Sequence, residues 1–187
     1  ATQINITLSP PPDLLVTEIT TPAITFSGQV INVTYEVRNT GDGITTDDIW
    51  KDQIWLVPAA NNNNGTSTVL GTRTHVGHLQ PDSIYLTSLQ VAIPANIFGD
   101  YQIRVHTDFT NDVFEFASEG NNQTLSDVFE IVLTPPVDLV PDSLITSDTI
   151  SLYQTNSISY QIHNNGGSSP TEGWTDRYYL SQSPVYN

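Results

Sequence analysis

The chain has 187 residues, which is more than one average domain of about 100–150 residues. It carries 20 Asp and Glu against 5 Lys and Arg, and the formal net charge of −15 excludes nucleic-acid binding because phosphate contacts need clustered cations. There is no cysteine, so disulfides and thiolate sites are excluded, and no apolar run is long enough to span a membrane.

Two blocks of the sequence match each other at a constant offset of about 125 residues. The segment VTYEVRNTG from Val33 matches ISYQIHNNG from Ile158, and after a one-residue deletion the pattern W-x-D-x-x-x-L from Trp50 recurs from Trp174. INITLSPPPDL, which contains most of residues 1–9, matches FEIVLTPPVDL at the end of the first whole block. A period of this length predicts a tandem array of domains rather than a solenoid of small units.

The repeat divides the chain into three parts. We expect residues 1–12 to be the last strand and linker of a preceding repeat, 13–134 a complete repeat, and 135–187 the linker and first half of a following repeat. Half-repeats expose apolar faces and open strand edges. We therefore expect either that the sequence is a window on a longer chain or that neighbouring chains supply the missing strands.

Alternating apolar residues predict a series of strands in the complete repeat. In chain order, the alternation runs through Leu15-Thr17-Ile19, Val33-Tyr35-Val37, Ile54-Leu56, Ile84-Leu86 with Leu89-Val91, Tyr101-Ile103-Val105 and Phe129-Ile131-Leu133. Turn-forming clusters of Gly, Pro, Asn and Asp separate these runs, and no window shows a helical period. The pattern predicts an all-β fold, an immunoglobulin-like antiparallel β-sandwich with about seven strands per repeat.

A family resemblance rests on the order of these motifs. The chain joins Asp13-Leu14 to VTYEVRNTGDG, then to W-x-D-x-x-x-L, to GDYQIRVHTD from Gly99, and to V-x-E-x-x-x-E-x-N-N-x-T from Val113. This order resembles the CARDB repeat, the cell adhesion related domain found in bacteria. The resemblance implies immunoglobulin-like sandwiches strung along large secreted or surface proteins, with a spacer or adhesive role.

Two acidic loops predict a candidate cation site. In an immunoglobulin-like sandwich the B–C and F–G loops lie at one pole, beside the start of the first strand. Ca²⁺ prefers six to eight oxygen ligands, so we expect calcium at this pole, where it would stiffen the joint with the preceding repeat. The alternative is that these acids are solvated turn residues. The candidate ligands are Asp42, Asp47, Asp48, Asp108, Asp112, Glu115 and Glu119.

Nothing in the sequence predicts an enzyme. There is no nucleophile elbow, zinc-protease motif or phosphate-binding Gly-rich loop, and His75 and His78 fall on opposite faces of a strand. Period 2 places Trp50, Asp52, Ile54 and Leu56 on one face and Trp55 on the other. Trp55 is therefore a candidate ligand residue that could stack on a sugar, with a rim aromatic as the alternative.

The sequence favours a non-enzymatic structural or adhesive repeat module of a larger bacterial surface protein or filament. Its expected location is extracellular, secreted or at the cell surface, and its expected partners are neighbouring repeats or other copies of itself. The alternative is a module that binds a surface glycan or a protein ligand, stiffened by Ca²⁺ and attached to a secreted enzyme or adhesin.

Overall fold

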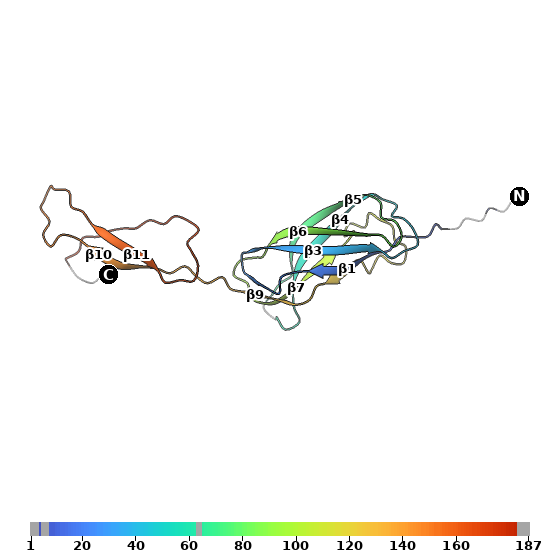
Figure 1. Cartoon of the computed structure of the whole chain (residues 1–187), viewed down its shortest axis with the longest axis horizontal. Helices are drawn as coiled ribbons and strands as arrows, with labels where there is room; N and C mark the ends of the chain where they lie inside the picture. Colours follow the sequence, from blue (N-terminus) through green and yellow to red (C-terminus); the bar gives the residue numbers. More distant parts are fainter. Residues whose placement is uncertain (1–3, 5–7, 63–64, 183–187) are drawn as a thin grey trace. The chain divides into compact units, whose positions relative to one another are not determined.

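The chain folds as two compact units, Ala1–Thr134 and Pro135–Asn187 (Figure 1). The computed structural model describes residues 4, 8–62 and 65–182. Over these ranges the regular secondary structure consists of β-strands, and the all-β class expected from the alternating pattern is confirmed. The strand expected near residues 1–9 falls mostly outside the described residues.

One sheet of the first unit contains three antiparallel strands. These are β1 (Leu14–Thr20), β3 (Val30–Asn39) and β6 (Ile84–Ala92), in the order β1-β3-β6. The central strand β3 alternates regularly between buried and exposed residues because its side chains point in turn to the core and to solvent. This regular register places Tyr35 inside the sandwich, opposite the second sheet.

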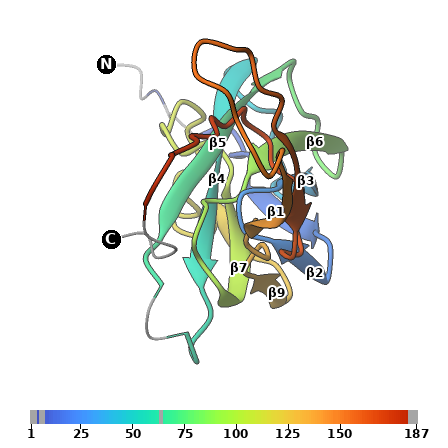
Figure 2. The same ribbon diagram turned by 90° about the vertical axis from the view of Figure 1, so that its left-hand side faces the viewer.

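The second sheet of the first unit has the order β2-β9-β7-β4-β5, and β8 pairs with β7 beside this path. Figure 2 shows β4, β5 and β7 as neighbours in one layer. The short pair β2–β9 is parallel, which differs from the expected antiparallel arrangement, whereas the other pairs in this sheet are antiparallel. The strands are β2 (Ile24–Phe26), β4 (Ile49–Pro58), β5 (Thr68–Val76), β7 (Gly99–His106), β8 (Gln123–Leu125) and β9 (Phe129–Val132).

The hydrophobic core lies between the two sheets of the first unit. The inward face of β4 carries Trp50, Asp52, Ile54 and Leu56, all of them fully buried, as the two-residue period predicts. Trp50 has no exposed surface and belongs to the core cluster. Burial of these side chains is the main stabilising contribution available to a domain without disulfides.

The apolar alternation assigned the wrong face to parts of two strands. In β1 the buried residues are Leu14 and Val16, and a β-bulge between Val16 and Glu18 then returns Ile19 to the core. In β6 the odd-numbered residues face inward, so that Leu86 is 67% exposed while Tyr85 points into the sandwich. Leucine is not confined to the core, because the strand register decides which face each residue occupies.

The second unit contains one antiparallel pair, β10 (Leu139–Ile145) and β11 (Ser159–Asn164). Its register is irregular between Pro141 and Ser143, at the positions that correspond to Val16 and Glu18 in β1. The apolar residues of this unit are extensively exposed, including Leu144, Trp174 and Leu180. The unit therefore has a strand pair but no closed core of its own among the described residues.

Candidate functional site

An N-terminal clasp, made by Asp13, Asn39, Gly41 and Gly43, fixes the chain where it begins β1. The Asn39 Oδ1 accepts hydrogen bonds from the backbone N–H groups of Asp13 (3.0 Å) and Gly41 (3.1 Å). Its Nδ2 donates to the carbonyl of Gly43 at 2.8 Å. Asn39 is fully buried, and these bonds satisfy its amide. The clasp thereby joins the start of β1 to the loop after β3.

The two glycines of the clasp allow the preceding prolines to lie against the loop. A Cβ on Gly41 would lie 2.5 Å from the carbonyl oxygen of Pro11, and a Cβ on Gly43 would overlap that of Pro10. The Gly43 N–H donates to the carbonyl of Pro11 at 3.1 Å. Close backbone approach is the physical reason for glycine here. The proline segment is thus fastened to its own unit.

The loop after β7 brings Glu115, Glu119, Asn121 and Asn122 to the same end of the sandwich as Asp13. Glu115 is fully buried, and its carboxylate accepts hydrogen bonds from the Leu14 N–H and the Asn122 Nδ2. The Glu119 Oε1 accepts from the Glu115 N–H at 2.7 Å, and the Asn121 Nδ2 donates to Asp13 at 2.9 Å. These contacts tie the long loop to the start of β1.

Asp108 and Asp112 organise the first part of the same loop. Asp108 is almost fully buried and accepts hydrogen bonds from the N–H groups of Asp112 and Val113, both at 2.9 Å. Asp112 is exposed and accepts from the Thr110 hydroxyl. Asp108 holds a positive φ of 45°, which aspartate tolerates better than most residues do. Its carboxylate therefore acts as a local cap for the loop.

The three acids of the loop after β3 do not join this cluster. Asp42, Asp47 and Asp48 are exposed, and the described polar contact of their carboxylates is the Thr46 hydroxyl on Asp47. Within the described ranges, no group of three or more His, Cys, Asp or Glu side chains converges in a way that could hold a metal ion. The expected set of seven acids is thus divided between exposed turn residues and buried acceptors of backbone amides.

Burial controls the protonation of the two buried acids of this pole. Desolvation is the main cause that raises the pKa of Glu115 to about 7. The hydrogen bonds from Asn122 and Leu14 lower this pKa, whereas the negative charges of Glu119 and Asp108 raise it. Desolvation likewise raises the pKa of Asp108 to about 6. Glu119 Oε2 and Asn122 Oδ1 are buried and have no hydrogen-bond partner. The pole therefore combines raised carboxyl pKa values with two buried oxygens that lack donors.

A buried polar cluster around Asp52 connects the two sheets. The Asp52 Oδ2 accepts hydrogen bonds from the Tyr35 hydroxyl of β3 and the Tyr85 hydroxyl of β6, both at 2.8 Å. Its Oδ1 accepts from the Thr107 hydroxyl at 2.8 Å and the Asp108 N–H at 3.4 Å. Burial raises the pKa of Asp52 despite these bonds. A buried carboxylate is tolerated because donors from both sheets satisfy it.

Aromatic rings extend this cluster toward β5. The Trp50 Nε1 donates to the Tyr85 hydroxyl at 3.3 Å, and the His75 ring stacks on Trp50 at 3.9 Å between centroids. Sequence reasoning did not identify Tyr85 or Thr107 as partners of Asp52, because nothing local marks them. The sequence did carry one signal for this pair, because Tyr35 and Asp52 recur as Tyr160 and Asp176 about 125 residues later.

Trp55 lies on the outer face of β4, as the two-residue period predicts, and is half-buried. Its Nε1 donates to Gln53 at 2.9 Å, and the Arg104 guanidinium carbon lies 4.9 Å from the centre of its ring. A shallow groove of about 370 Å³ beside Arg104 is lined by Val57, Gln123, Thr124 and Leu125. The cation covers a ring surface that a sugar would need for stacking.

The second unit repeats the geometry of the clasp. Asn164 Oδ1 accepts from the N–H groups of Asp138 (3.0 Å) and Gly166 (2.9 Å), and Asn164 Nδ2 donates to the carbonyl of Ser168 at 2.7 Å. A Cβ on Gly166 would overlap the carbonyl oxygen of Pro136, as a Cβ on Gly41 would crowd that of Pro11. The same local structure therefore begins both units.

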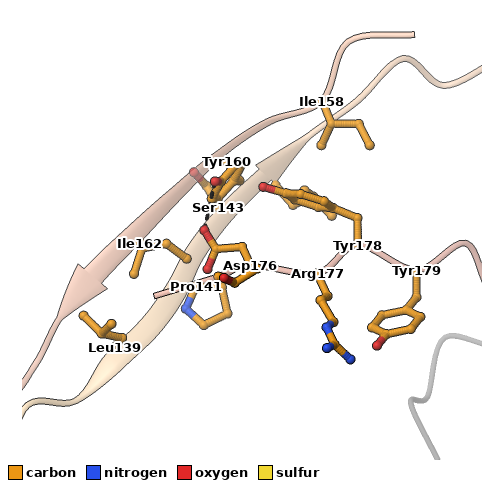
Figure 3. A pocket seen from close by; sticks show the side chains of 12 residues that line it. Leu139, Pro141, Ser143, Ile158, Tyr160, Ile162, Asp176, Arg177, Tyr178 and Tyr179 are labelled. Atoms are coloured by element: carbon orange, nitrogen blue, oxygen red, sulfur yellow. Dashed lines mark hydrogen bonds between the residues drawn. The ribbon is translucent and has the colours of Figure 1, made fainter. Parts of the chain in front are cut away.

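A groove of about 430 Å³ lies on one face of the second unit (Figure 3). Tyr160 of β11 and Tyr178 project toward one another across it, with ring centroids 5.2 Å apart. The Tyr160 hydroxyl donates to the Asp176 Oδ2 at 2.9 Å, as Tyr35 donates to Asp52 in the first unit. The remaining lining is mostly apolar and comes from β10, β11 and residues 175–179.

A family model described as CARDB matches residues 11–126, and the comparison with curated proteins gave no match. The chain is similar to a CARDB domain from Pyrococcus furiosus that was crystallised in complex with di-metal ions. The two sequences are 23% identical and the TM-score is 0.49, and the match covers 68% of this chain and 100% of that chain. It is also similar to β-glucosidase 3B from Thermotoga neapolitana, at 15% identity and a TM-score of 0.43 over 64% of this chain and 16% of that one. Over the described ranges, no helix is long and apolar enough to cross a membrane.

Proposed function

The chain belongs to the CARDB family, and from this premise we propose that it is an extracellular structural or adhesive module that spaces neighbouring domains of a bacterial surface protein. CARDB domains are non-catalytic modules associated with bacterial surface proteins, which supports both the location and the lack of an enzymatic role. The observation that carries the proposal is the way each unit holds its end of the linker.

The linker between β9 and β10 is anchored on both sides. Thr134 donates through its N–H to the Ser27 Oγ at 3.2 Å and through its hydroxyl to the Ser27 carbonyl. Immediately after it, Pro136 lies against Gly166 and Pro135 against Gly167, within their own unit. A linker of prolines with anchored ends has few accessible conformations. This arrangement suits a spacer, which must hold its neighbours apart.

The recurrence of the clasp supports a tandem array with a period of about 125 residues. In such an array the partners of each module are the preceding and following repeats. Residues 1–12, 13–134 and 135–187 are then the end of one repeat, a complete repeat and the front of the next. Copies in series multiply the length of one unit without any new fold.

The spacer role is tested by the motion of the linker amides. We expect ¹⁵N heteronuclear NOE values of Thr134, Val137 and Asp138 to equal those of strand residues such as Ile103, because the linker is fastened at both ends. Insertion of a Gly-Ser segment after Thr134 is the control: the inserted amides should have low values, whereas Val137 and Asp138 keep theirs because the clasp of the second unit holds them. Equally low values in the unmodified chain would contradict the spacer role.

Calcium binding at the N-terminal pole is a second candidate function, favoured by the two buried oxygens without donors. Glu119 Oε2 and Asn122 Oδ1 lack partners, and they lie in the loop that also carries buried Glu115. A cation there would be held by the two carboxylates together with amide or backbone oxygens, a donor set that suits Ca²⁺. The exposed acids Asp42, Asp47 and Asp48 would not coordinate the ion and would favour its binding only through their negative charge.

Thermal unfolding tests the calcium proposal. We expect the melting temperature to be higher in millimolar CaCl₂ than in EDTA, because a ligand that binds only the folded state stabilises it by about 3 kcal/mol at a hundredfold excess over Kd. Glu119→Gln is the matched control: it retains an oxygen for the Glu115 N–H and removes the charge, so the calcium effect is lost. Identical melting curves for the unmodified chain in both buffers would eliminate this site.

The alternative of glycan or protein binding at Trp55 has weaker support. Arg104 lies over the indole and Gln53 occupies its N–H, so a ligand would first have to displace the guanidinium. A glycan-array signal from the intact chain that disappears in Trp55→Ala would favour this alternative over a purely structural module.

A further inference from the structure

Two strands of the first unit end their sheets on the same side of the sandwich. Strand β6 is the last strand of the sheet β1-β3-β6, and β5 is the last strand of the sheet that contains β4, so neither is paired on its other side by a described strand. The two strands contact each other, for example at Gly71, where a Cβ would lie 2.8 Å from the Leu89 Cδ2. This side of the sandwich therefore presents two sheet edges next to each other.

The edge of β6 lacks the features that normally protect an exposed strand. Its nine residues, Ile84–Ala92, include no charged residue and no proline, in a chain whose net charge is −15. Its pairing with β3 continues without a bulge along the whole strand. Exposed edges in native proteins are usually short, charged, bulged or covered, because an unprotected edge pairs with other chains. The composition of β6 therefore indicates an edge that a partner strand covers.

Alternate residues of β6 direct their backbone groups away from β3. The Ser83 carbonyl accepts a hydrogen bond from the Asn39 N–H at 3.0 Å, and the Ile93 N–H donates to the Gln29 carbonyl at 2.8 Å. The odd-numbered residues are thus the ones that bond to β3. In an antiparallel pair the intervening residues point their N–H and C=O groups the other way. The even-numbered residues of β6 therefore offer donors and acceptors at the free edge.

A pocket of about 320 Å³ lies between the edges of β5 and β6. It is lined by consecutive residues of both strands, 73–76 of β5 and 85–87 of β6, together with Asp52. Consecutive lining residues mean that the pocket follows the backbone of both strands. This shape suits an extended chain that pairs with one edge and places a side chain in the pocket.

Arg73 gives the pocket a positive charge. It lies opposite Asp52 in the register of β4 and β5, but the ion pair formed by the described residues is Arg38–Asp82, outside the pocket. Asp52 instead accepts hydrogen bonds from three hydroxyls and a backbone N–H inside the sandwich. A carboxylate that enters the pocket would therefore find the guanidinium group of Arg73 available as a donor.

Exposed apolar side chains flank the same edge. Ile84, Leu86 and Val76 are each more than half exposed. Ile84 and Leu86 belong to the outer face of β6, whereas Tyr85 and Thr87 face inward and line the pocket. A strand paired with β6 would place its side chains alternately beside Leu86 and in the pocket. The edge therefore favours a segment with one acid between two apolar residues.

We propose that the free edge of β6 binds an extended segment of a partner protein, which adds a fourth strand to the sheet β1-β3-β6. The segment carries an acidic side chain that faces inward and pairs with Arg73, between apolar residues that face outward and cover Ile84 and Leu86. Backbone hydrogen bonds supply the affinity, and the pocket supplies the selectivity for the acid. The inference goes beyond the spacer role, because it gives the first unit a partner outside the array.

A second copy of this chain is a poorer partner for this edge. Two molecules that each carry a net charge of −15 repel each other. The β6 strand of a second copy would bring no acid to Arg73, since it is uncharged. The segment Phe129-Glu130-Ile131 of β9 has an acid between apolar residues, but β9 is already paired with β2 and β7 in its own sheet.

The first experiment selects peptides on the intact chain. A phage library of random heptapeptides is selected on the unmodified chain, on Arg73→Gln and on Arg38→Gln. We expect peptides with an Asp or Glu between two apolar residues to be enriched on the unmodified chain. Arg38→Gln is the matched control and should enrich the same peptides, because Arg38 pairs with Asp82 outside the pocket. On Arg73→Gln the preference for an acid should be lost.

A synthetic copy of the most enriched peptide then tests the mode of binding. Hydrogen exchange of the Leu86 and Ser88 amides should slow several-fold when the peptide saturates the chain, whereas the Thr87 amide, which points to β3, should not change. Ser88→Pro removes one donor of the free edge, where proline is tolerated, and should weaken binding about tenfold by calorimetry. Ser88→Ala is the matched control, since it loses the same hydroxyl but keeps the N–H, and should bind like the unmodified chain.

The inference is overturned if acidic peptides are not enriched, or if they are enriched equally on Arg73→Gln. Exchange of the Leu86 and Ser88 amides that the peptide leaves unchanged would overturn it as well. A dimer of the unmodified chain that protects these two amides without peptide, seen by light scattering, would overturn it in favour of a second copy. The spacer role is tested on the linker amides, so the two failures are distinguishable.

Discussion

Glu115 is the residue on which the N-terminal pole depends. It has no exposed surface, yet its carboxylate accepts hydrogen bonds from the Leu14 N–H and from Asn122. Desolvation outweighs these bonds and raises its pKa from 4.5 to about 7. Asn122 Oδ1 has no donor, so rotation of this amide would provide an acceptor for a protonated Glu115. Desolvation, and not the hydrogen bonds, therefore favours the neutral form of Glu115.

The raised pKa predicts how stability depends on pH. Because the pKa of Glu115 is higher in the folded than in the unfolded chain, the stabilisation from its protonated form is fully present below about pH 4.5 and is lost as the pH rises through about 7. Asp108, raised to about 6, acts in the same direction. The free energy of unfolding should therefore fall between pH 5 and pH 8, by up to about 1.4 kcal/mol per pH unit for each linked proton.

Denaturant titrations across this range check the prediction. Glu115→Gln should flatten the dependence, because its neutral amide has no proton to lose, whereas the exposed Asp47→Asn should leave the slope unchanged. Equal slopes for the unmodified chain and Glu115→Gln would show that Glu115 does not titrate between pH 5 and pH 8.

Among the structural elements, the clasp holds the linker, and its two glycines are required by close approach rather than by unusual dihedral angles. Gly43 has no room for a Cβ beside the Pro10 carbonyl, and its N–H donates to Pro11. The hairpins and sheets would form without this contact, but the proline segment would leave the domain. The clasp therefore determines the direction of the linker rather than the fold.

Gly43→Ala should loosen the clasp. We expect the free energy of unfolding to fall by about 1–3 kcal/mol, the usual cost of forcing extra atoms into a packed site. Chemical denaturation measures the change. Gly120→Ala is the matched control, since no atom lies within 4 Å of a Cβ at that position, and its effect should stay within about 0.5 kcal/mol. A Gly43→Ala variant as stable as Gly120→Ala would show that the prolines are not packed on the loop in solution.

At the scale of the whole molecule, the first unit is a closed sandwich and the second is an open strand pair with the same clasp. The first unit replaces the disulfide that this chain cannot form by a carboxylate, Asp52, which accepts hydrogen bonds from both sheets. In the described part of the second unit, Asp176 accepts a hydrogen bond from Tyr160, the counterpart of Tyr35. In the first unit, by contrast, the buried carboxylate of Asp52 joins the two sheets through donors from both of them.

The sequence alone was sufficient to predict the all-β class, the CARDB family and the inward face of β4, from Trp50 to Leu56. These properties follow from local alternation and motif order, which each short segment carries in itself. Sequence did not predict the inward face of β6, because Ile84 and Leu86 are as apolar as the residues that are buried. The bulge in β1 was likewise invisible, since it is a property of the pairing with β3.

The candidate pole shows the same division between sequence and tertiary structure. The sequence determined how many acids the loops carry and that a clasp motif recurs after about 125 residues. Only the tertiary structure decided that Glu115 and Asp108 turn inward to hold backbone amides while Asp42, Asp47 and Asp48 remain in solvent. The physical reason is that the role of a carboxylate depends on its solvation. The same side chain is a solvated charge in an exposed turn and a desolvated hydrogen-bond acceptor where segments distant in the sequence bury it.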